Sequence, residues 1–304
     1  MKHFLTMLEL SKQEFEEILN TAKSLKRAQQ QPLKGKVLGM IFEKPSTRTR
    51  VSFEVGMQQL GGHAVYLNKN DIQIGRGETV ADTSRVLSRY CDFLMARVFS
   101  HSTLEEMAKY SSVPVINGLS DIHHPCQIMG DLLTLQEKFG KLMGLKLAYV
   151  GDGNNVCNSL LIGCAMAGVH ISVGCPNSHA PNKDVIREAN NIAKSTGSKI
   201  EIVDDPVDAV RNAHAIYTDT WVSMGDEAQK EEREKIFKNY QVNSVLGHYA
   251  TPNWVFMHCL PAHRGQEVTN DVIDGKHSVV WDEAENRLHI QKAILAFLDK
   301  RRSI

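Results

Sequence analysis

The chain has 304 residues, of which 42% are hydrophobic and 23% are charged, which is typical of a water-soluble protein large enough for two hydrophobic cores. Its 35 basic residues balance 35 acidic residues, so no overall charge draws it to nucleic acid or to an anionic membrane. Six scattered cysteines without a CxxC pair, and an N-terminus without the apolar core of a signal peptide, favour reduced thiols in a cytoplasmic protein.

Short apolar runs alternate with helical periodicity along the chain, which predicts an α/β fold built on parallel sheets. The alternation occurs in two sets. In the first set, strands are expected within 36–42, 63–67, 91–98 and 113–117, and helices within 11–29, after Pro45, within 78–90, near 104–110 and after Pro125. In the second set, strands are expected within 145–153, 170–176, 199–205, 214–221 and 254–261, and helices within 155–167, 183–194, 226–240 and from about 282; the segment 206–213 connects two of these strands.

These two sets predict two domains, 1–138 and 139–285, each a parallel β-sheet flanked by helices, with the active site in the cleft between them. The periodicity of the C-terminal helix, about 286–304, fits either domain, and we expect it to pack back on the first. No repeat and no low-complexity linker interrupts the pattern.

The segment EKPSTRTRVSFE, residues 43–54, places hydroxyl groups and arginines between an apolar strand and a helix. A helix start leaves N–H groups unpaired and carries partial positive charge, so anions bind there readily. Ser46, Thr47 and Thr49 add donors, while Arg48 and Arg50 point to nearly opposite sides of the helix, so we expect only Arg48 to reach a phosphate. The alternative is ordinary helix capping with solvated arginines.

A second polar segment, DIHHPCQ at 121–127, also follows an apolar strand and precedes a helix. His124 and Gln127 offer donors and acceptors suited to a carbonyl or an amide, and Pro125 suits a first helical turn. Arg97, in MARV, ends another strand, where open α/β sheets gather ligand groups. Taken alone, a histidine before a proline is more often a helix cap.

Together these motifs resemble the transcarbamylase family, whose members move a carbamoyl group from carbamoyl phosphate to an amine. The STRTR and HPCQ segments carry the family likeness, and Arg97 lies between them. DTWVSMG at 219–225 and HCLPAHRG at 258–265 resemble the ornithine-binding loop and the cysteine segment of ornithine carbamoyltransferases, and AENR ends at Arg287. The motifs occur in the family's order over essentially the whole chain.

The resemblance implies a carbamoyl phosphate-binding first domain, an ornithine-binding second domain, and a product, L-citrulline. It assigns the phosphate to Ser46, Thr47, Arg48 and Thr49. It assigns the carbamoyl group and its surroundings to Arg97, His124, Pro125, Cys126 and Gln127, completed from the second domain by Cys259, Leu260 and Arg287. It assigns ornithine to Asn155, Asp219, Ser223 and Met224. It also implies a homotrimer, with scope for higher assembly, in which Gln73 reaches the site of an adjacent subunit.

Within this resemblance, the catalytic residues are Arg97, His124, Gln127 and Cys259. A role for Cys259 as a thiolate that helps to neutralise the amine is a hypothesis, motivated by the neighbouring His258, His263 and Arg264. The transfer needs no cofactor, and the histidines form no HExxH or clustered cysteine pattern, so we expect no metal.

Three alternatives remain open at this stage. The segment YVGDGNNVCNS suggests a dinucleotide site, but GxGxxG would need glycine at Val156, and no acidic residue ends the strand ISVGCP. A binding protein that kept the pocket and lost the chemistry is a second alternative. A transcarbamylase for a related amine, such as putrescine or N-acetylornithine, is the third; Asp219 and the SMG loop favour free L-ornithine, because an amine without α-amino and α-carboxyl groups would leave these polar groups unpaired.

Overall fold

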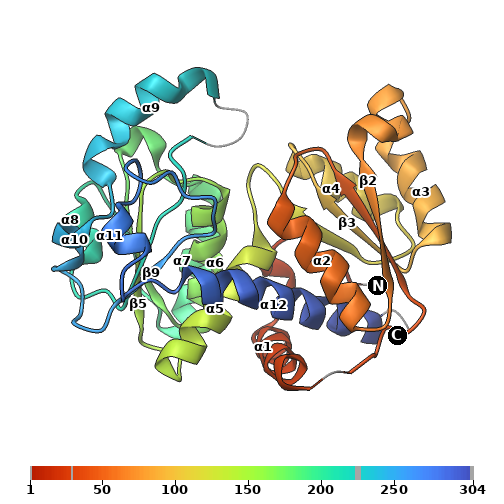
Figure 1. The fold of residues 1–304 in the computed structure, drawn as a ribbon, viewed down its shortest axis with the longest axis horizontal. Helices are drawn as coiled ribbons and strands as arrows, with labels where there is room; N and C mark the ends of the chain where they lie inside the picture. The colour runs from red at the N-terminus through yellow and green to blue at the C-terminus, as the bar shows by residue number, and fades with distance from the viewer. Residues whose placement is uncertain (1, 29, 223–226, 302–304) are drawn as a thin grey trace. The chain divides into compact units, whose positions relative to one another are not determined.

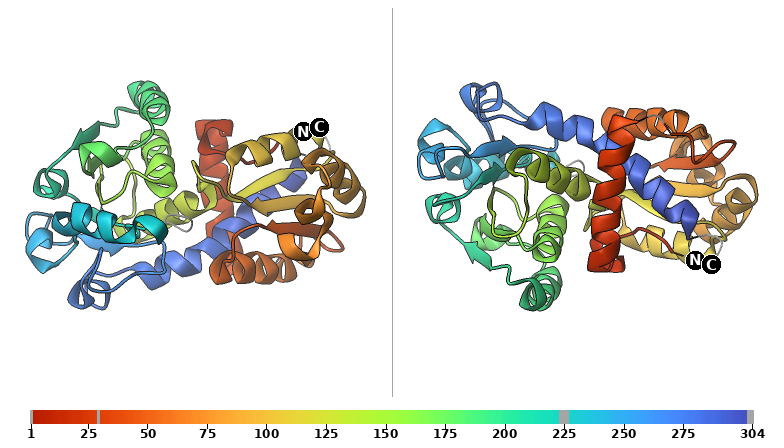
Figure 2. Two further views of the ribbon diagram at one scale, coloured as in Figure 1. Left: turned by 90° about the horizontal axis from the view of Figure 1, so that it is seen from above. Right: turned by 90° about the horizontal axis from the view of Figure 1, so that it is seen from below.

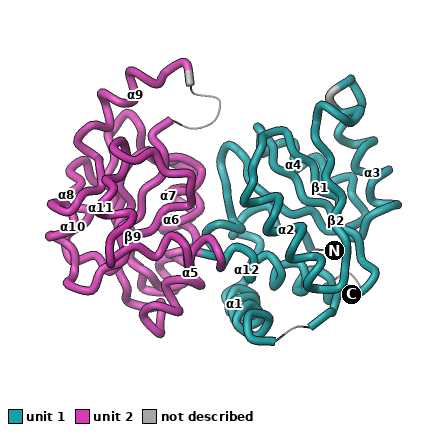
Figure 3. The backbone as a smooth tube through the Cα atoms, in the orientation of Figure 1, with its two compact units in different colours: residues 1–130, 286–304 teal, residues 131–285 magenta. Residues whose placement is uncertain are grey.

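The computed structural model describes residues 2–28, 30–222 and 227–301. The chain divides into two compact units, which Figure 3 distinguishes by colour: unit 1 comprises 1–130 and 286–304, and unit 2 comprises 131–285. The chain passes from unit 1 to unit 2 within helix α5 (Pro125–Phe139), and it returns to unit 1 within helix α12 (Val280–Lys300). Each unit contains one parallel sheet, so the two-domain α/β fold predicted from the sequence is confirmed.

Unit 1 contains a four-stranded parallel sheet with the order β2-β1-β3-β4. The strands are β1 (Val37–Phe42), β2 (His63–Asn68), β3 (Phe93–Arg97) and β4 (Val115–Leu119). Strands β1, β3 and β4 are apolar and almost wholly buried, as expected where helices cover both faces of a parallel sheet, whereas edge strand β2 is partly exposed. Helix α1 (Lys12–Arg27) precedes β1, and the helices between the strands are α2 (Thr47–Gln59), α3 (Val80–Tyr90) and α4 (His101–Tyr110).

The C-terminal part of α12 belongs to unit 1, where Figures 1 and 2 show it beside α1. The ammonium group of Lys292 donates to the carbonyl oxygen of Leu25 on α1 at 3.1 Å and to the side-chain oxygen of Gln59 on α2 at 2.9 Å. These bonds tie the end of the chain to two N-terminal helices. The ammonium group of the buried Lys292 side chain thus fixes a long-range contact that periodicity alone did not determine.

Unit 2 contains a five-stranded parallel sheet with the order β7-β6-β5-β8-β9. The strands are β5 (Lys146–Val150), β6 (His170–Gly174), β7 (Ile200–Val203), β8 (Ala215–Tyr217) and β9 (Val255–Met257). The helices are α6 (Asn155–Ala167), α7 (Lys183–Thr196), α8 (Pro206–Val210), α9 (Lys230–Phe237), α10 (Ser244–Gly247) and α11 (Asn270–Ile273). Helix α6 is buried over most of its length, which explains its small and apolar composition.

Both sheets reverse their strand order at one position, between β1 and β3 in unit 1 and between β5 and β8 in unit 2. Loops that leave neighbouring strands in opposite directions open a crevice at the carboxyl end of the sheet, where ligands bind in α/β folds. The STRTR segment follows β1, and Asp219 follows β8. The topology therefore places the sequence motifs where each sheet can accept a ligand.

Some boundaries differ from the sequence-based expectation. The charged helix expected over 226–240 is shorter, because α9 covers Lys230–Phe237 between 3-10 turns at Glu227–Gln229 and Lys238–Tyr240. The last helix begins at Val280, slightly before the expected position. Among the helices that the structure describes, none has the length and apolarity required to cross a membrane.

Candidate active site

The turn between β1 and α2 forms a helix start with free donor capacity. Ser46 is the N-cap of α2, and its hydroxyl oxygen accepts a hydrogen bond from the backbone N–H of Thr49 at 3.3 Å. The first turn of α2 contains no acidic side chain. The positive end of this helix is therefore not neutralised by its own sequence, and an anion would be stabilised there.

Arg48 and Arg50, both on this first turn, have different surroundings. Arg50 donates to Glu54 at 3.1 Å, and its guanidinium lies 3.8 Å from the centre of the Tyr66 ring. The Nε atom of Arg48 is buried and has no hydrogen-bond partner among the described residues. Since a buried donor without a partner is costly, Arg48 is the arginine poised to bind an additional acceptor.

Two further arginines reach the same region of unit 1. Arg97, at the carboxyl end of β3, is 5% exposed, and the register between β3 and β4 shifts at Ala96 and Arg97. Such an irregularity changes the direction of a side chain at a strand end. Arg287, on α12, donates to the hydroxyl oxygen of Thr49 at 2.8 Å. The resemblance placed Arg287 with the second domain, whereas the structure groups the chain from Asn286 onward with unit 1.

His124 lies among these three guanidinium groups, immediately before α5. Burial lowers the pKa of His124 well below its ordinary value, and the positive charges of Arg287, Arg97 and Arg48 lower it further. The imidazole is therefore neutral at physiological pH. We call Arg48, Arg97, Arg287 and His124 the arginine cluster; it combines concentrated positive charge with one neutral hydrogen-bonding ring.

The other predicted site residues of unit 1 lie in different surroundings. Pro125 opens α5, Gln127 is fully buried in its first turn, and Thr47 is the first residue of α2. Cys126 is also fully buried; burial raises the pKa of its thiol to about 12, and the thiol donates to the carbonyl oxygen of Asn117 at 3.4 Å. The Cys126 side chain is thus a structural thiol. Gln73 lies exposed on the short 3-10 helix Gln73–Arg76.

In unit 2, the carboxylate of Asp219 lies at the end of β8 and is held by two neighbours. Asn154 donates from its amide to Asp219 Oδ2 at 2.8 Å, and the Cys259 thiol donates to Asp219 Oδ1 at 3.1 Å. Asp219 is 8% exposed. Asn155 is the first residue of α6, whereas Ser223 and Met224 lie outside the described residues. The loops after β5, β8 and β9 thus contribute to one polar group.

The surroundings of Cys259 contradict the thiolate hypothesis. Burial raises the pKa of the Cys259 thiol well above its ordinary value, and the charge of Asp219 and its hydrogen bond raise it further. The guanidinium of Arg264 pairs with Asp274 instead, at 2.5 Å and 2.8 Å, and the ring of His258 bonds to Glu267. Cys259 is therefore a neutral hydrogen-bond donor in this structure.

Among the described residues, the ligand atoms of Asp219, His258 and Cys259 lie within 4.8 Å of one another and could hold a metal ion. The donor set does not favour one, because both ring nitrogens of His258 already have partners. Its Nδ1 accepts from the backbone N–H of Leu260 at 2.8 Å, and its Nε2 lies 3.2 Å from Glu267. We assign no metal here.

Two structural contributors were not identified from the sequence. Asn154 caps α6 and also holds Asp219; its position directly after the DG pair in the loop that follows β5 was the available signal. Arg233, on α9, donates to the carbonyl oxygen of Trp221 at 2.5 Å and forms an ion pair with Asp152. It thereby links α9 to the loops after β5 and β8, and no local pattern indicated this.

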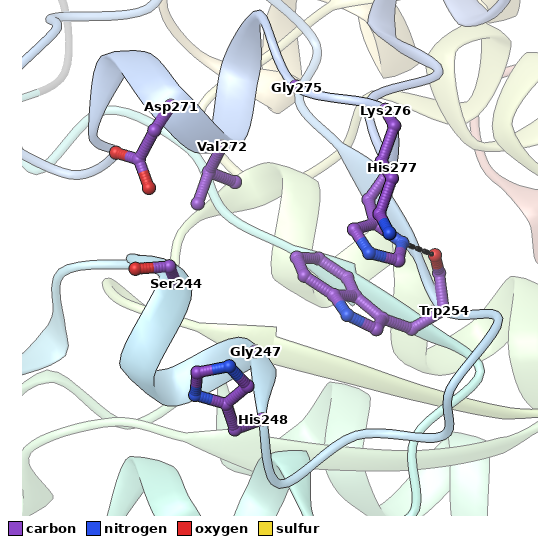
Figure 4. Close-up of a pocket in the computed structure, with 9 residues that line it drawn as sticks. All are labelled: Ser244, Gly247, His248, Trp254, Asp271, Val272, Gly275, Lys276 and His277. Carbon is purple, nitrogen blue, oxygen red and sulfur yellow. Dashed lines mark hydrogen bonds between the residues drawn. The ribbon is translucent and has the colours of Figure 1, made fainter.

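A cavity of about 210 Å³ in unit 2 lies apart from these residues (Figure 4). The Trp254 ring, which lines this cavity, is stacked on His277 with a centroid separation of 4.5 Å. A Cβ atom at Gly247 would lie 2.5 Å from the Trp254 ring, so glycine is required for this packing. Of the predicted site residues that the structure describes, none lines this cavity.

Comparison with known proteins gives a consistent result. Residues 2–137 match the model of the aspartate/ornithine carbamoyltransferase carbamoyl-P binding domain, and residues 143–298 match that of the Asp/Orn binding domain. A Pyrococcus horikoshii protein named ornithine carbamoyltransferase is 56% identical over 302 residues, which are 98% of this chain and 95% of that protein.

Solved structures agree with this result. The ornithine carbamoyltransferase from Pyrococcus furiosus has a TM-score of 0.95 and 54% identity, covering 98% of this chain and 96% of that one. An acetylornithine transcarbamylase complexed with acetylcitrulline has a TM-score of 0.90 and 34% identity, covering 98% and 99% of the two chains. On these matches and on the arrangement of its site residues, the chain belongs to the aspartate/ornithine carbamoyltransferase family.

Proposed function

We propose that this protein is an enzyme that transfers the carbamoyl group of carbamoyl phosphate to the δ-amine of L-ornithine, giving L-citrulline and phosphate. Family membership and the high identity to proteins named ornithine carbamoyltransferase support this activity. The observation that carries it is the arginine cluster beside the start of α2, whose first turn contains no acidic side chain. A small phosphorylated reactant with concentrated negative charge fits that environment.

In this proposal, the start of α2 binds the phosphate group through Ser46, Thr47, Arg48 and Thr49. Arg97, His124 and Gln127 contact the carbamoyl group, with Pro125 and Cys126 shaping the helix start, and Cys259, Leu260 and Arg287 complete the pocket. Negative charge grows on the carbonyl oxygen and on the leaving phosphate as the amine attacks. Fixed guanidinium groups and a neutral imidazole donor stabilise that charge more strongly than water does.

Asp219 is proposed to bind the α-ammonium group of ornithine, and Asn155 its α-carboxylate, with Ser223 and Met224 from the SMG loop. Asn154 supports this role, because it orients the Asp219 carboxylate through a direct hydrogen bond. The δ-amine of ornithine resembles that of lysine, whose ordinary pKa is about 10.4. Only the unprotonated amine attacks, so kcat/KM for ornithine is expected to rise with pH.

We also propose a cytoplasmic homotrimer, with scope for further association, in which Gln73 contacts the carbamoyl phosphate bound by a neighbouring subunit. The exposure of Gln73 in the single chain is compatible with this role. Neither nucleic acid nor a membrane is a proposed partner, and no cofactor takes part in the transfer.

A steady-state assay with three acceptor amines tests the proposal. Purified protein, carbamoyl phosphate and ornithine, putrescine or N-acetylornithine would be compared by colorimetric detection of the ureido product and by phosphate release. We expect ornithine to be preferred by at least roughly a hundredfold in kcat/KM, because either competitor leaves a charged or polar partner unpaired. Arg48→Ala serves as the matched inactive protein. A preference for another amine, or no ureido product, would overturn the assignment.

A further inference from the structure

The backbone at Leu260 has an unusual conformation beside the proposed site. Its φ angle is +57°, and among the described residues only Asn212 shares a positive φ without being glycine. The left-handed region is sterically unfavourable for a leucine, so the conformation persists only where surrounding contacts determine it, often at functional sites.

The ring of His258 supplies one such contact. The backbone N–H of Leu260 donates to His258 Nδ1 at 2.8 Å, and the histidine side chain is fully buried. A nitrogen that accepts a hydrogen bond carries no proton, so in the neutral ring the proton resides on Nε2. The turn at Leu260 is therefore compatible with only one tautomer of His258.

Glu267 selects that tautomer. Its Oε1 atom lies 3.2 Å from His258 Nε2 and also accepts the backbone N–H of His263 at 2.5 Å. The Glu267 side chain is fully buried. An ionised carboxylate only accepts hydrogen bonds, so it requires a proton on Nε2 and leaves Nδ1 free for Leu260.

A second buried acid holds the preceding peptide. The backbone N–H of His258 donates to Glu283 Oε2 at 2.9 Å, while the Tyr217 hydroxyl donates to Glu283 Oε1 at 3.2 Å. Cys259 lies between these two anchored peptides and donates to Asp219. The positions of both Cys259 and Leu260 thus depend on contacts made by His258 and Glu283, in addition to the bond from Cys259 to Asp219.

We propose that His258 and Glu267 are positioning residues: the Glu267 carboxylate fixes the Nε2-protonated ring of His258, and His258 Nδ1 holds the left-handed turn that presents Cys259 and Leu260 to the substrates. This inference rests on the proposed function of those two residues. It assigns no direct substrate contact to His258 or Glu267.

Two substitutions of His258 distinguish the loss of the hydrogen bond to Leu260 from the loss of the imidazole ring. Asn places an oxygen near the position of His Nδ1, whereas Gln extends its polar atoms toward the position of Nε2. His258→Asn should therefore keep an acceptor for the Leu260 N–H, and His258→Gln should lose it. We expect kcat to fall roughly ten- to a hundredfold in His258→Gln, the cost of one unsatisfied buried donor, and only a few-fold in His258→Asn.

The matched control is His170→Gln. His170 Nδ1 also accepts a backbone N–H, from Lys199 at 3.0 Å, but at an exposed position near the start of β6. This substitution removes the same kind of bond and should leave kcat and both KM values unchanged. Equal kcat in His258→Asn and His258→Gln, with both variants folded by circular dichroism, would overturn the proposal.

A spectroscopic measurement tests the tautomer without reference to activity. In protein labelled with ¹⁵N-histidine, the ring nitrogens of His258, assigned by their loss in His258→Asn, should show a protonated Nε2 and an unprotonated Nδ1. Glu267→Gln offers an amide donor to the ring and should shift the proton toward Nδ1. A protonated Nδ1 in the unaltered protein would overturn the proposal, whereas absent citrulline formation with the expected tautomer would instead refute the proposed function.

Discussion

Arg48 and Arg50 lie on the same helical turn, but their side chains make different interactions. Arg50 is engaged with Glu54 and Tyr66, whereas Arg48 keeps a buried donor without a partner among the described residues. The alternation was predictable from helical geometry, because residues two apart on a helix face nearly opposite directions. The thiolate hypothesis for Cys259 rested instead on neighbours in the sequence. Arg264 and His258 bond to other residues, because proximity along a loop does not determine side-chain direction.

Arg48→Ala and Arg50→Ala should therefore differ. The first should lower kcat/KM for carbamoyl phosphate by roughly a hundredfold or more with little change in stability, because a charge that stabilises the transition state is lost. The second should lower the free energy of unfolding by about 1 kcal/mol or less, through loss of an exposed ion pair and a cation–π contact. Steady-state kinetics and urea unfolding of both variants measure this difference. Equal losses of kcat/KM in two stably folded variants would contradict it.

At the scale of elements, strands and long helices were predictable because their apolar patterns extend over several residues. The buried strands β1, β3 and β5 read as continuous apolar runs, which parallel sheets require. The four-residue helices α10 and α11 were not predicted, since each is about one helical turn and shows no periodicity. The packing of α12 rests on individual long-range bonds from Lys292 and Arg287, which no local pattern records.

The loop between β4 and α5 makes stability depend on pH through His123. This residue is 7% exposed and packs edge-on against His101, with ring centroids 5.2 Å apart. Burial lowers the pKa of His123 to about 4, with a smaller effect from the charge of His101. The pKa of His101 is itself lowered by burial, against the opposing charges of Glu105 and Asp121.

Because the folded state binds fewer protons than the unfolded state between pH 6.5 and about 4, the free energy of unfolding falls as pH decreases through this window. The His123 contribution is fully present above pH 6.5, and its loss should approach about 3 kcal/mol near pH 4. Urea unfolding at intervals from pH 7.5 to 4.5 should show a shallower decline for His123→Asn than for the unaltered protein. The exposed His63→Asn is the control; identical slopes in all three proteins would contradict the assignment.

For the whole molecule, two sets of alternating strands and helices indicated two domains, and both sheets place their motifs at a reversal of strand order. The periodicity of the C-terminal helix fitted either domain, and the grouping of Arg287 with unit 1 depends on how the chain returns after unit 2. Only the family resemblance, through Gln73, indicated that neighbouring subunits share a site. The exposure of Gln73 in the single chain makes that proposal testable by mixing subunits.

Gln73→Ala and Arg48→Ala proteins should each have low activity, and a dissociated and reassembled mixture should recover part of it. If each site takes Arg48 from one subunit and Gln73 from the next, random cyclic trimers of an equal mixture contain both native residues at about a quarter of their sites. We therefore expect about a quarter of the unaltered specific activity, measured as citrulline formation, once hybrid trimers are verified by native mass spectrometry. A mixture of Arg48→Ala with Arg97→Ala is the control, because both residues belong to the arginine cluster of one subunit and every hybrid site retains one defect. Verified hybrids without recovery, or a fully active Gln73→Ala protein, would confine each site to a single subunit and remove the functional reason for the trimer.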